Sequence, residues 1–141
     1  MIIAVDFDGT CVAHEFPEIG HDIGAIPVLK KIIENGHNIV LCTIRDNRHK
    51  LNRDTGNIEI CDIEEESLLY DAIRWFEEND IKLYGVNNNP DQFTWSWSRK
   101  IYARYYIDDS SIGCPLVYPK SGRPYVSWKK VSNILHEMNI I

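Results

Sequence analysis

Two acidic residues follow an apolar run at the start of the sequence. The run 2–7 is rich in β-branched residues and has the length of a strand, and Asp6 and Asp8 lie near its end. Side chains two apart on a strand point the same way, and Gly9 lets the backbone turn sharply after them. Two close carboxylates repel unless a cation or a shared proton separates them, which favours a hard cation such as Mg²⁺. A solvated acidic turn is the alternative interpretation.

A second acidic pair, Asp108 and Asp109, ends another apolar run, 103–107. Four carboxylates gathered at one place would repel strongly without a metal ion. The Thr43 hydroxyl, at the end of the run NIVLCT, can donate to a phosphate oxygen or to its own turn. The Lys100 ammonium can lie over the site or stay in solvent.

Apolar runs of strand length alternate along the chain with segments of helical periodicity. We expect strands at 2–7, 38–43, 82–86, 103–107 and 115–118, and helices at 23–35, 64–79, 98–103 and 127–137. This alternation predicts an α/β fold, a three-layer Rossmann-like domain whose mainly parallel central sheet is flanked by helices on both faces. Ligands bind beyond the carboxyl ends of such strands, where Asp6, Thr43 and Asp108 would then lie.

The composition is that of an ordinary globular domain. With 141 residues, 44% of them hydrophobic, we expect one domain spanning 1–141. No apolar run approaches a membrane span and no signal-peptide pattern precedes Asp6, so we expect a cytosolic (cytoplasmic) protein without a membrane partner. The net charge of -6 argues against duplex nucleic acid as a partner. The cysteines are widely spaced, without a CxxC pair, and are interpreted as reduced thiols.

The residues with chemical potential follow an order that resembles a known family. The succession of DFDGT from Asp6 to Thr10, LCT ending at Thr43, Lys100, and IDD ending at Asp109 resembles the four motifs of the haloacid dehalogenase (HAD) superfamily of phosphohydrolases. The stretch SRKIYARYYIDD resembles the tail of its small, cap-less members. Receiver domains of response regulators use the same groups, but there the acid pair follows the first strand. Here the DxD comes first and the acid pair last, which favours the hydrolase.

The resemblance implies a Mg²⁺-dependent phosphatase that hydrolyses a phosphomonoester through an aspartyl phosphate. Asp6 would be the nucleophile and Asp8 the acid and base, while Thr43 and Lys100 would hold phosphoryl oxygens. A non-enzymatic or very slow phosphoacceptor, acting as a regulatory binding module, would use the same acidic metal site. The lifetime of the phosphoenzyme separates the two functions.

The resemblance also implies a metal site and an open entrance to it. Asp6, the backbone carbonyl of Asp8, and Asp108 would hold Mg²⁺, and Asp109 would lie beside them or share the site. The segment 11–21 is too short for a cap domain. An open site of this kind accepts large substrates or is closed by a neighbouring subunit, so a homo-oligomer is one expectation.

Loops at the same edge are expected to contact the substrate. Gly9 and Thr10 complete the first motif and are expected to bind the substrate. Arg45 and Arg48 follow Thr43 in a basic loop, where they would meet a second anionic group or stay solvated.

The substrate itself stays open between several classes. Trp95 and Trp97 would stack on a base or a sugar, or pack in the core or against a subunit. A sugar phosphate, a nucleotide and a phosphorylated nucleic-acid end all fit the predicted chemistry, and a small molecule is favoured over a macromolecule.

Overall fold

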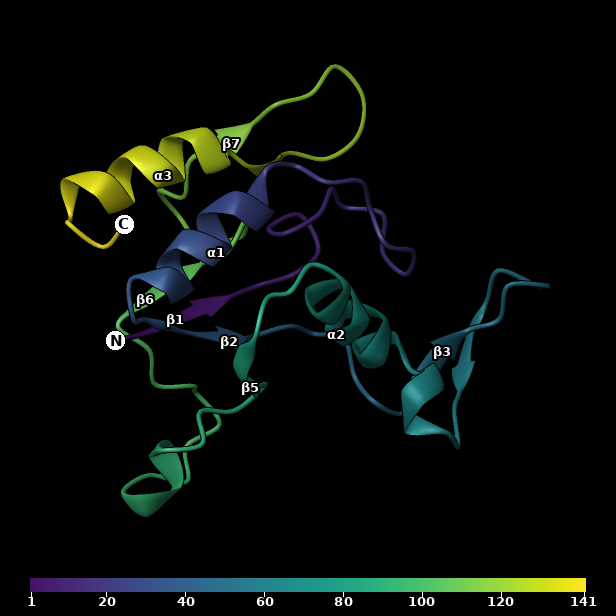
Figure 1. Ribbon diagram of the computed structural model, residues 1–141. Coiled ribbons are helices and arrows are strands. Elements are labelled where there is room, and N and C mark those ends of the chain that lie inside the picture. The colour runs from purple at the N-terminus through teal and green to yellow at the C-terminus, as the bar shows by residue number, and fades with distance from the viewer.

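A four-stranded parallel sheet forms the centre of the structure, a computed structural model that describes residues 1–141. Its strands are β1 (Ile2–Val5), β2 (Asn38–Leu41), β5 (Leu83–Val86) and β6 (Tyr105–Ile107). Their order in the sheet is β5-β2-β1-β6, with every pair parallel (Figure 1). The predicted α/β fold with a parallel sheet is therefore confirmed.

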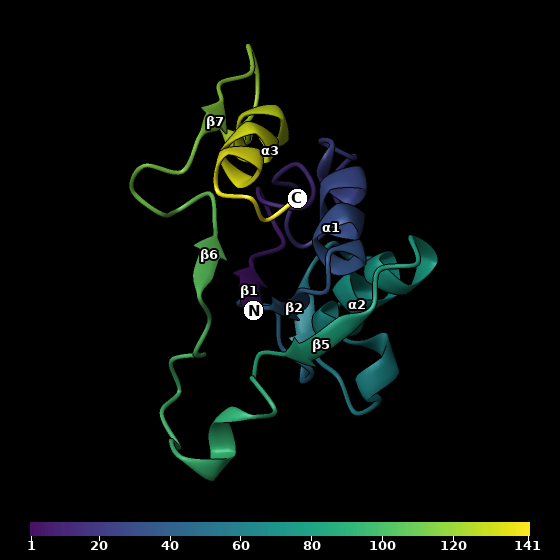
Figure 2. The same cartoon turned by 60° about the vertical axis from the view of Figure 1, so that its left-hand side comes forward.

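Three helices pack against one face of this sheet. They are α1 (Ala25–Glu34), α2 (Leu68–Glu78) and α3 (Trp128–Glu137). One hydrophobic core joins apolar residues of all three to alternate residues of β1, Ile3 and Val5. The crossovers β1–α1–β2 and β2–α2–β5 step in the same direction along the sheet, so right-handed connections put both helices on the same face (Figure 2). No helix combines the length and the apolar character needed to cross a bilayer.

The other face of the sheet is covered without an α-helix. The connection from β5 to β6 reverses direction in the sheet, so a right-handed crossover runs over the opposite face. Tyr106 pairs with Ala4, shares that face with it, and donates its hydroxyl to the Ile101 carbonyl. The segment 87–104 therefore lies across this face, where Ala4 and Val40 are buried. The prediction that helices flank both faces of the sheet is therefore wrong for this second face.

The predicted helix at 98–103 does not form, for a local reason. The Ser96 hydroxyl accepts the Ser98 N–H at 3.2 Å, and the Ser98 hydroxyl accepts the Lys100 N–H at the same distance. Such side-chain bonds offer the backbone an alternative to the helical ladder. The only regular turn in the segment is the short 3₁₀ helix η2 (Gln92–Thr94).

Two short hairpins project from the core. The hairpin of β7 (Leu116–Val117) and β8 (Tyr125–Val126) contains the strand predicted at 115–118. The hairpin of β3 (His49–Leu51) and β4 (Ile58–Ile60) was not predicted, because strands of three residues are too short to show a clear pattern in the sequence. It leads through the 3₁₀ turn η1 (Glu64–Glu66) into α2.

Candidate functional site

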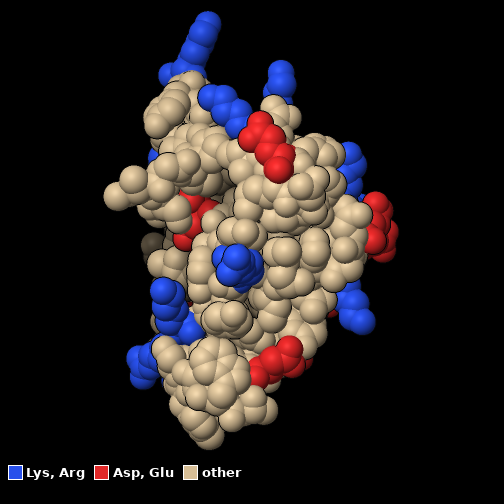
Figure 3. Space-filling view, turned by 90° about the vertical axis from the view of Figure 1, so that its left-hand side faces the viewer, with Lys and Arg blue, Asp and Glu red and all other residues tan.

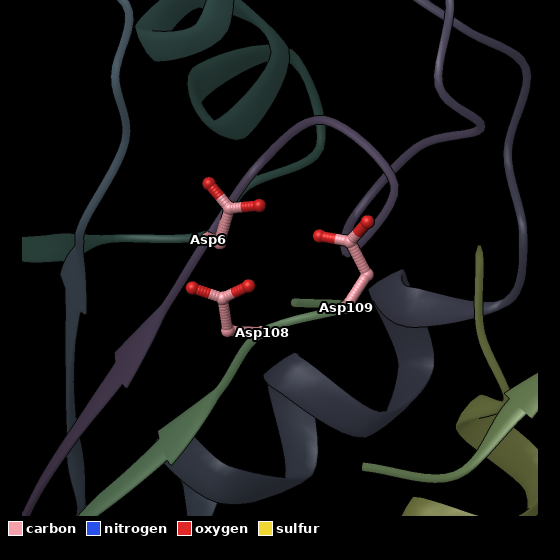
Figure 4. Close-up of side chains that lie close together, drawn as sticks. All are labelled: Asp6, Asp108 and Asp109. Atoms are coloured by element: carbon pink, nitrogen blue, oxygen red, sulfur yellow. The ribbon is translucent and has the colours of Figure 1, made fainter. Parts of the chain in front are cut away.

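Three carboxylates meet where β1 and β6 end. Asp6 follows β1 directly, and Asp108 and Asp109 follow β6 (Figure 4). The two strands pair with Val5 beside Ile107, and the Asp6 N–H donates to the Ile107 carbonyl at 3.0 Å. One oxygen from each carboxylate lies within 4.8 Å of the others. The predicted meeting of the first and last motifs is confirmed for these three acids.

The charges in this cluster oppose one another. Burial, with the charges of Asp108 and Asp109 added to it, raises the pKa of Asp6 to about 7 from its ordinary value near 3.8. Burial and the charge of Asp108 also raise the pKa of Asp109. None of the three carboxylates forms an ion pair with a side chain of the protein. Three oxygen donors without a paired cation are a donor set that suits a hard divalent ion.

Gly9 and Thr10 position these acids and do not reach the solvent. The fully buried Thr10 hydroxyl lies 3.2 Å from Asp6 Oδ2 and 3.4 Å from Asp109 Oδ1, and accepts the Asp109 N–H at 3.0 Å. Gly9 has a φ of +83°, and a Cβ there would lie 2.6 Å from Asp109 Oδ2. Its N–H already donates to the Val12 carbonyl. The prediction that Gly9 and Thr10 bind substrate is wrong: both are positioning residues.

Arg45 is a second correction, because it is buried against Asp8. Its Nε and Nη2 donate to the two carboxylate oxygens of Asp8 at 2.7 and 2.8 Å. Its remaining donors reach the carbonyls of Pro17, Glu18 and Leu68. Only 1% of Arg45 is exposed. Arg45 therefore holds Asp8 and the loops around it, and does not reach a substrate.

The Asp8 carboxylate lies outside the cluster of three. The strand rule that would align Asp8 with Asp6 no longer applies, because β1 ends at Val5 and Phe7 begins a turn. The Phe7 carbonyl accepts three backbone N–H groups from the residues that follow. The Asp8 side chain thus turns toward Arg45 and away from the cluster. The predicted contact of the Asp8 backbone carbonyl with a metal ion stays a prediction.

The other predicted residues lie at differing distances from the cluster. The Thr43 N–H donates to Asn87 Oδ1 at 2.8 Å, and the Thr43 hydroxyl accepts a backbone N–H of its own turn, which leaves its proton free. Lys100 lies on the segment that covers the second face, with its ammonium 6.0 Å from the centre of the Tyr106 ring. The exposed Arg48 side chain makes no hydrogen bond. The structure brings neither Lys100 nor Arg48 into contact with the aspartates.

A cavity of about 290 Å³ opens over the cluster. Besides Asp6, Asp8 and Asp109, it is lined by His14, Phe16, Ile44, Ser110 and Arg123. Sequence reasoning missed Arg123, which lies in the β7–β8 turn. That hairpin reaches the site because the Val126 N–H donates to the Gly9 carbonyl at 2.9 Å. The charges of Arg123 and His14 oppose the rise in the pKa of Asp109.

Comparison with known proteins supports the fold over nearly the whole chain. A solved structure, that of a conserved protein coded by a locus of Bacteroides thetaiotaomicron, is similar to this one with a TM-score of 0.68 and 29% sequence identity. The match covers 98% of this chain and 91% of that chain. No protein-family model matches, and no curated protein does. The similarity supports the α/β fold and brings no activity with it.

Proposed function

We propose that this protein is a divalent-metal-dependent phosphohydrolase that acts on a phosphomonoester, the activity implied by its resemblance to the HAD superfamily. The observation that carries the proposal is the cluster of Asp6, Asp108 and Asp109, whose oxygens lie within 4.8 Å of one another. The carboxylate of the proposed nucleophile lies in that cluster. Thr43 supports the proposal, because its hydroxyl keeps a proton to donate.

The donor set of the cluster fits Mg²⁺. Asp108 Oδ1 accepts the Ser110 N–H, and Asp109 Oδ1 lies beside the Thr10 hydroxyl, so each acid keeps a second oxygen for a cation. When bound, Mg²⁺ would neutralise charge on the phosphoryl oxygens.

The chain's own residues supply the nucleophile and the proton transfers. An oxygen of Asp6 would form a bond to phosphorus as the ester P–O bond breaks, and the leaving oxygen would take a proton from Asp8. A water molecule would then attack the phosphorus, the bond from Asp6 to phosphorus would break, and Asp8 would receive the proton of that water. The Thr43 hydroxyl would donate to a phosphoryl oxygen throughout.

The pairing of Asp8 with Arg45 favours a second candidate function. Both oxygens of Asp8 accept hydrogen bonds from Arg45, so only the lone pairs that face away from Arg45 are open to the proton that the hydrolase mechanism needs. Proton transfer would be slow where the leaving oxygen or the water does not reach those lone pairs. The observation therefore also fits a phosphoacceptor module, in which Asp6 is phosphorylated and loses the phosphoryl group slowly.

The first experiment is phosphate release from an aryl phosphate, with Mg²⁺ or with EDTA. We expect turnover that needs Mg²⁺, is lost in Asp6→Asn and persists in Asp54→Asn, which changes an exposed acid of the β3–β4 turn. Circular dichroism checks that Asp6→Asn folds. Turnover that survives Asp6→Asn would contradict the assignment of the nucleophile.

A phosphorylation experiment separates the two candidates. Acetyl phosphate would be offered to the protein, and mass spectrometry would follow the phosphoryl group on Asp6. A short-lived phosphoenzyme with release of phosphate supports the hydrolase, and a persistent one supports the phosphoacceptor. Absence of both a phosphoenzyme and turnover would contradict both functions.

A further inference from the structure

Exposed aromatic side chains are concentrated in the stretch from η2 to the end of β6, residues 92–107. They belong to Phe93, Trp95, Trp97, Tyr102 and Tyr106. Trp95 is 62% exposed and Trp97 is 87% exposed, although both are large apolar rings. A group of such rings in contact with water is typical of a surface that a partner covers.

The same stretch carries only positive charge. Residues 92–107 include Arg99, Lys100 and Arg104 and no Asp or Glu, in a chain whose net charge is -6. In Figure 3, Lys and Arg side chains lie along the left side of the lower part of the molecule, and an acidic group lies on the right side of that part. A symmetric contact with a second copy would bring these cations together, whereas a polyanion complements them.

The first of two adjoining grooves has a volume of about 440 Å³. Its walls include Trp95, Tyr102 and Tyr106, with the Trp95 and Tyr102 rings edge to face at 5.3 Å between centroids. Lys100 lines the same groove, with its ammonium 6.0 Å from the Tyr106 ring. The groove thus sets a cation beside flat apolar rings.

The second groove repeats this combination in about 160 Å³. Phe93 and Trp97 lie edge to face at 6.3 Å, and Arg99 lines the groove with them. Asn87 also lines it, and its side-chain oxygen accepts the Thr43 N–H. The second groove therefore reaches the side chain that holds Thr43, which follows β2 at the same edge of the sheet as Asp6.

One buried side chain holds the two grooves in place. Gln92 is 5% exposed, and its Nε2 donates to the Ser98 and Lys100 carbonyls at 3.1 and 2.9 Å. Its Oε1 accepts the Tyr102 N–H at 2.8 Å. The backbone that carries Lys100 and Tyr102 is thus fixed before any ligand arrives, which lowers the entropy lost on binding.

We propose that this aromatic–basic surface, defined by the five exposed rings and the three cations named above, binds single-stranded nucleic acid. Successive bases stack in the two grooves, and Arg99 and Lys100 contact the phosphates between them. Stacking needs unpaired bases, so a duplex does not fit. If the proposed function holds, the phosphorylated end of the bound strand is the substrate and lies at Thr43; this step rests on the proposed function. The binding of the strand does not depend on the proposed function.

Fluorescence anisotropy with a labelled oligothymidylate, in EDTA and low salt, tests the binding without turnover. We expect the single strand to bind and a duplex of equal length to bind far more weakly. Trp95→Ala and Trp97→Ala should each weaken binding by about 5- to 150-fold, as expected for loss of one stacked base. Tyr118→Ala removes an exposed ring in the β7–β8 turn, away from this surface, and should leave binding unchanged.

The salt dependence tests the role of the cations. Lys100→Gln should reduce the slope of log affinity against log salt by about 0.7, while Lys129→Gln should not change it. No binding of the single strand, or equal binding by the Trp95→Ala and Trp97→Ala variants, would overturn the proposal. Self-association that Trp97→Ala abolishes, without oligonucleotide binding, would assign the surface to a second copy instead. Binding that persists in a protein without phosphatase activity would count against the proposed function alone.

Discussion

Replacing Arg45 by methionine should destabilise the protein strongly. The side chain is 1% exposed and makes five hydrogen bonds, two to Asp8 and three to backbone carbonyls. Arg45→Met leaves the buried Asp8 carboxylate without its partner, and methionine fills the space without donating. Removal of one partner of a buried pair costs about 3–5 kcal/mol, a large part of a total stability of about 5–15 kcal/mol.

A matched exposed pair supplies the control. Arg53 and Glu18 lie 2.9 Å apart with side chains 66% and 54% exposed, so Arg53→Met should change the free energy of unfolding much less than Arg45→Met does. Urea unfolding followed by circular dichroism measures both free energies. The double variant Asp8→Asn with Arg45→Met should lose less than the sum of the single losses. The reasoning is refuted if Arg45→Met is no less stable than Arg53→Met and only raises KM for a phosphomonoester, since Arg45 would then bind substrate.

Three further predictions concern the carboxylate cluster. Gly9→Ala should destabilise the protein more than Gly36→Ala in urea unfolding. Both glycines have a positive φ, but only at Gly9 would a Cβ meet a neighbour, Asp109. Equal losses of stability in the two variants would contradict this close approach. Without metal, the free energy of unfolding should fall by up to about 4 kcal/mol as pH rises from about 4 to 7, because the raised pKa of Asp6 lets the folded state keep a proton that the unfolded state has lost. Urea titrations in EDTA should find a smaller fall in Asp6→Asn. Arg123→Gln should raise KM about tenfold for the phosphomonoester if its guanidinium meets the phosphate, and an unchanged KM would exclude that contact.

The parallel sheet and the acidic cluster were predictable because both depend on local patterns. The strands β1 and β2 are continuous apolar runs, which are typical of a buried parallel sheet. Parallel strands end at a common edge, so Asp6 and Asp108 were expected at that edge, although the pairing of β1 with β6 that brings them into contact was not predicted. Neither step needed knowledge of a contact between side chains distant in sequence.

The role of Arg45 depends on contacts that no local pattern encodes. Its partner Asp8 lies 37 residues away, and its three carbonyl partners come from two further segments. An arginine in a loop is usually exposed, and burial of one is understandable only when its partners are known. Arg123 was missed for a similar reason, because the β8 backbone has to dock on Gly9 before the turn reaches the cavity.

The missing helix on the second face and the aromatic–basic surface have one cause. In the segment that joins β5 to β6, Ile101 and Ala103 are buried while Tyr102 and Arg104 are exposed. This alternation is that of an extended chain, whereas a helix would direct neighbours three and four apart to the same side. The inward side chains cover the sheet, and the outward ones supply two members of the exposed surface. A sequence of helical period at this place would have closed the second face with a helix and left no row of rings beside the candidate active site.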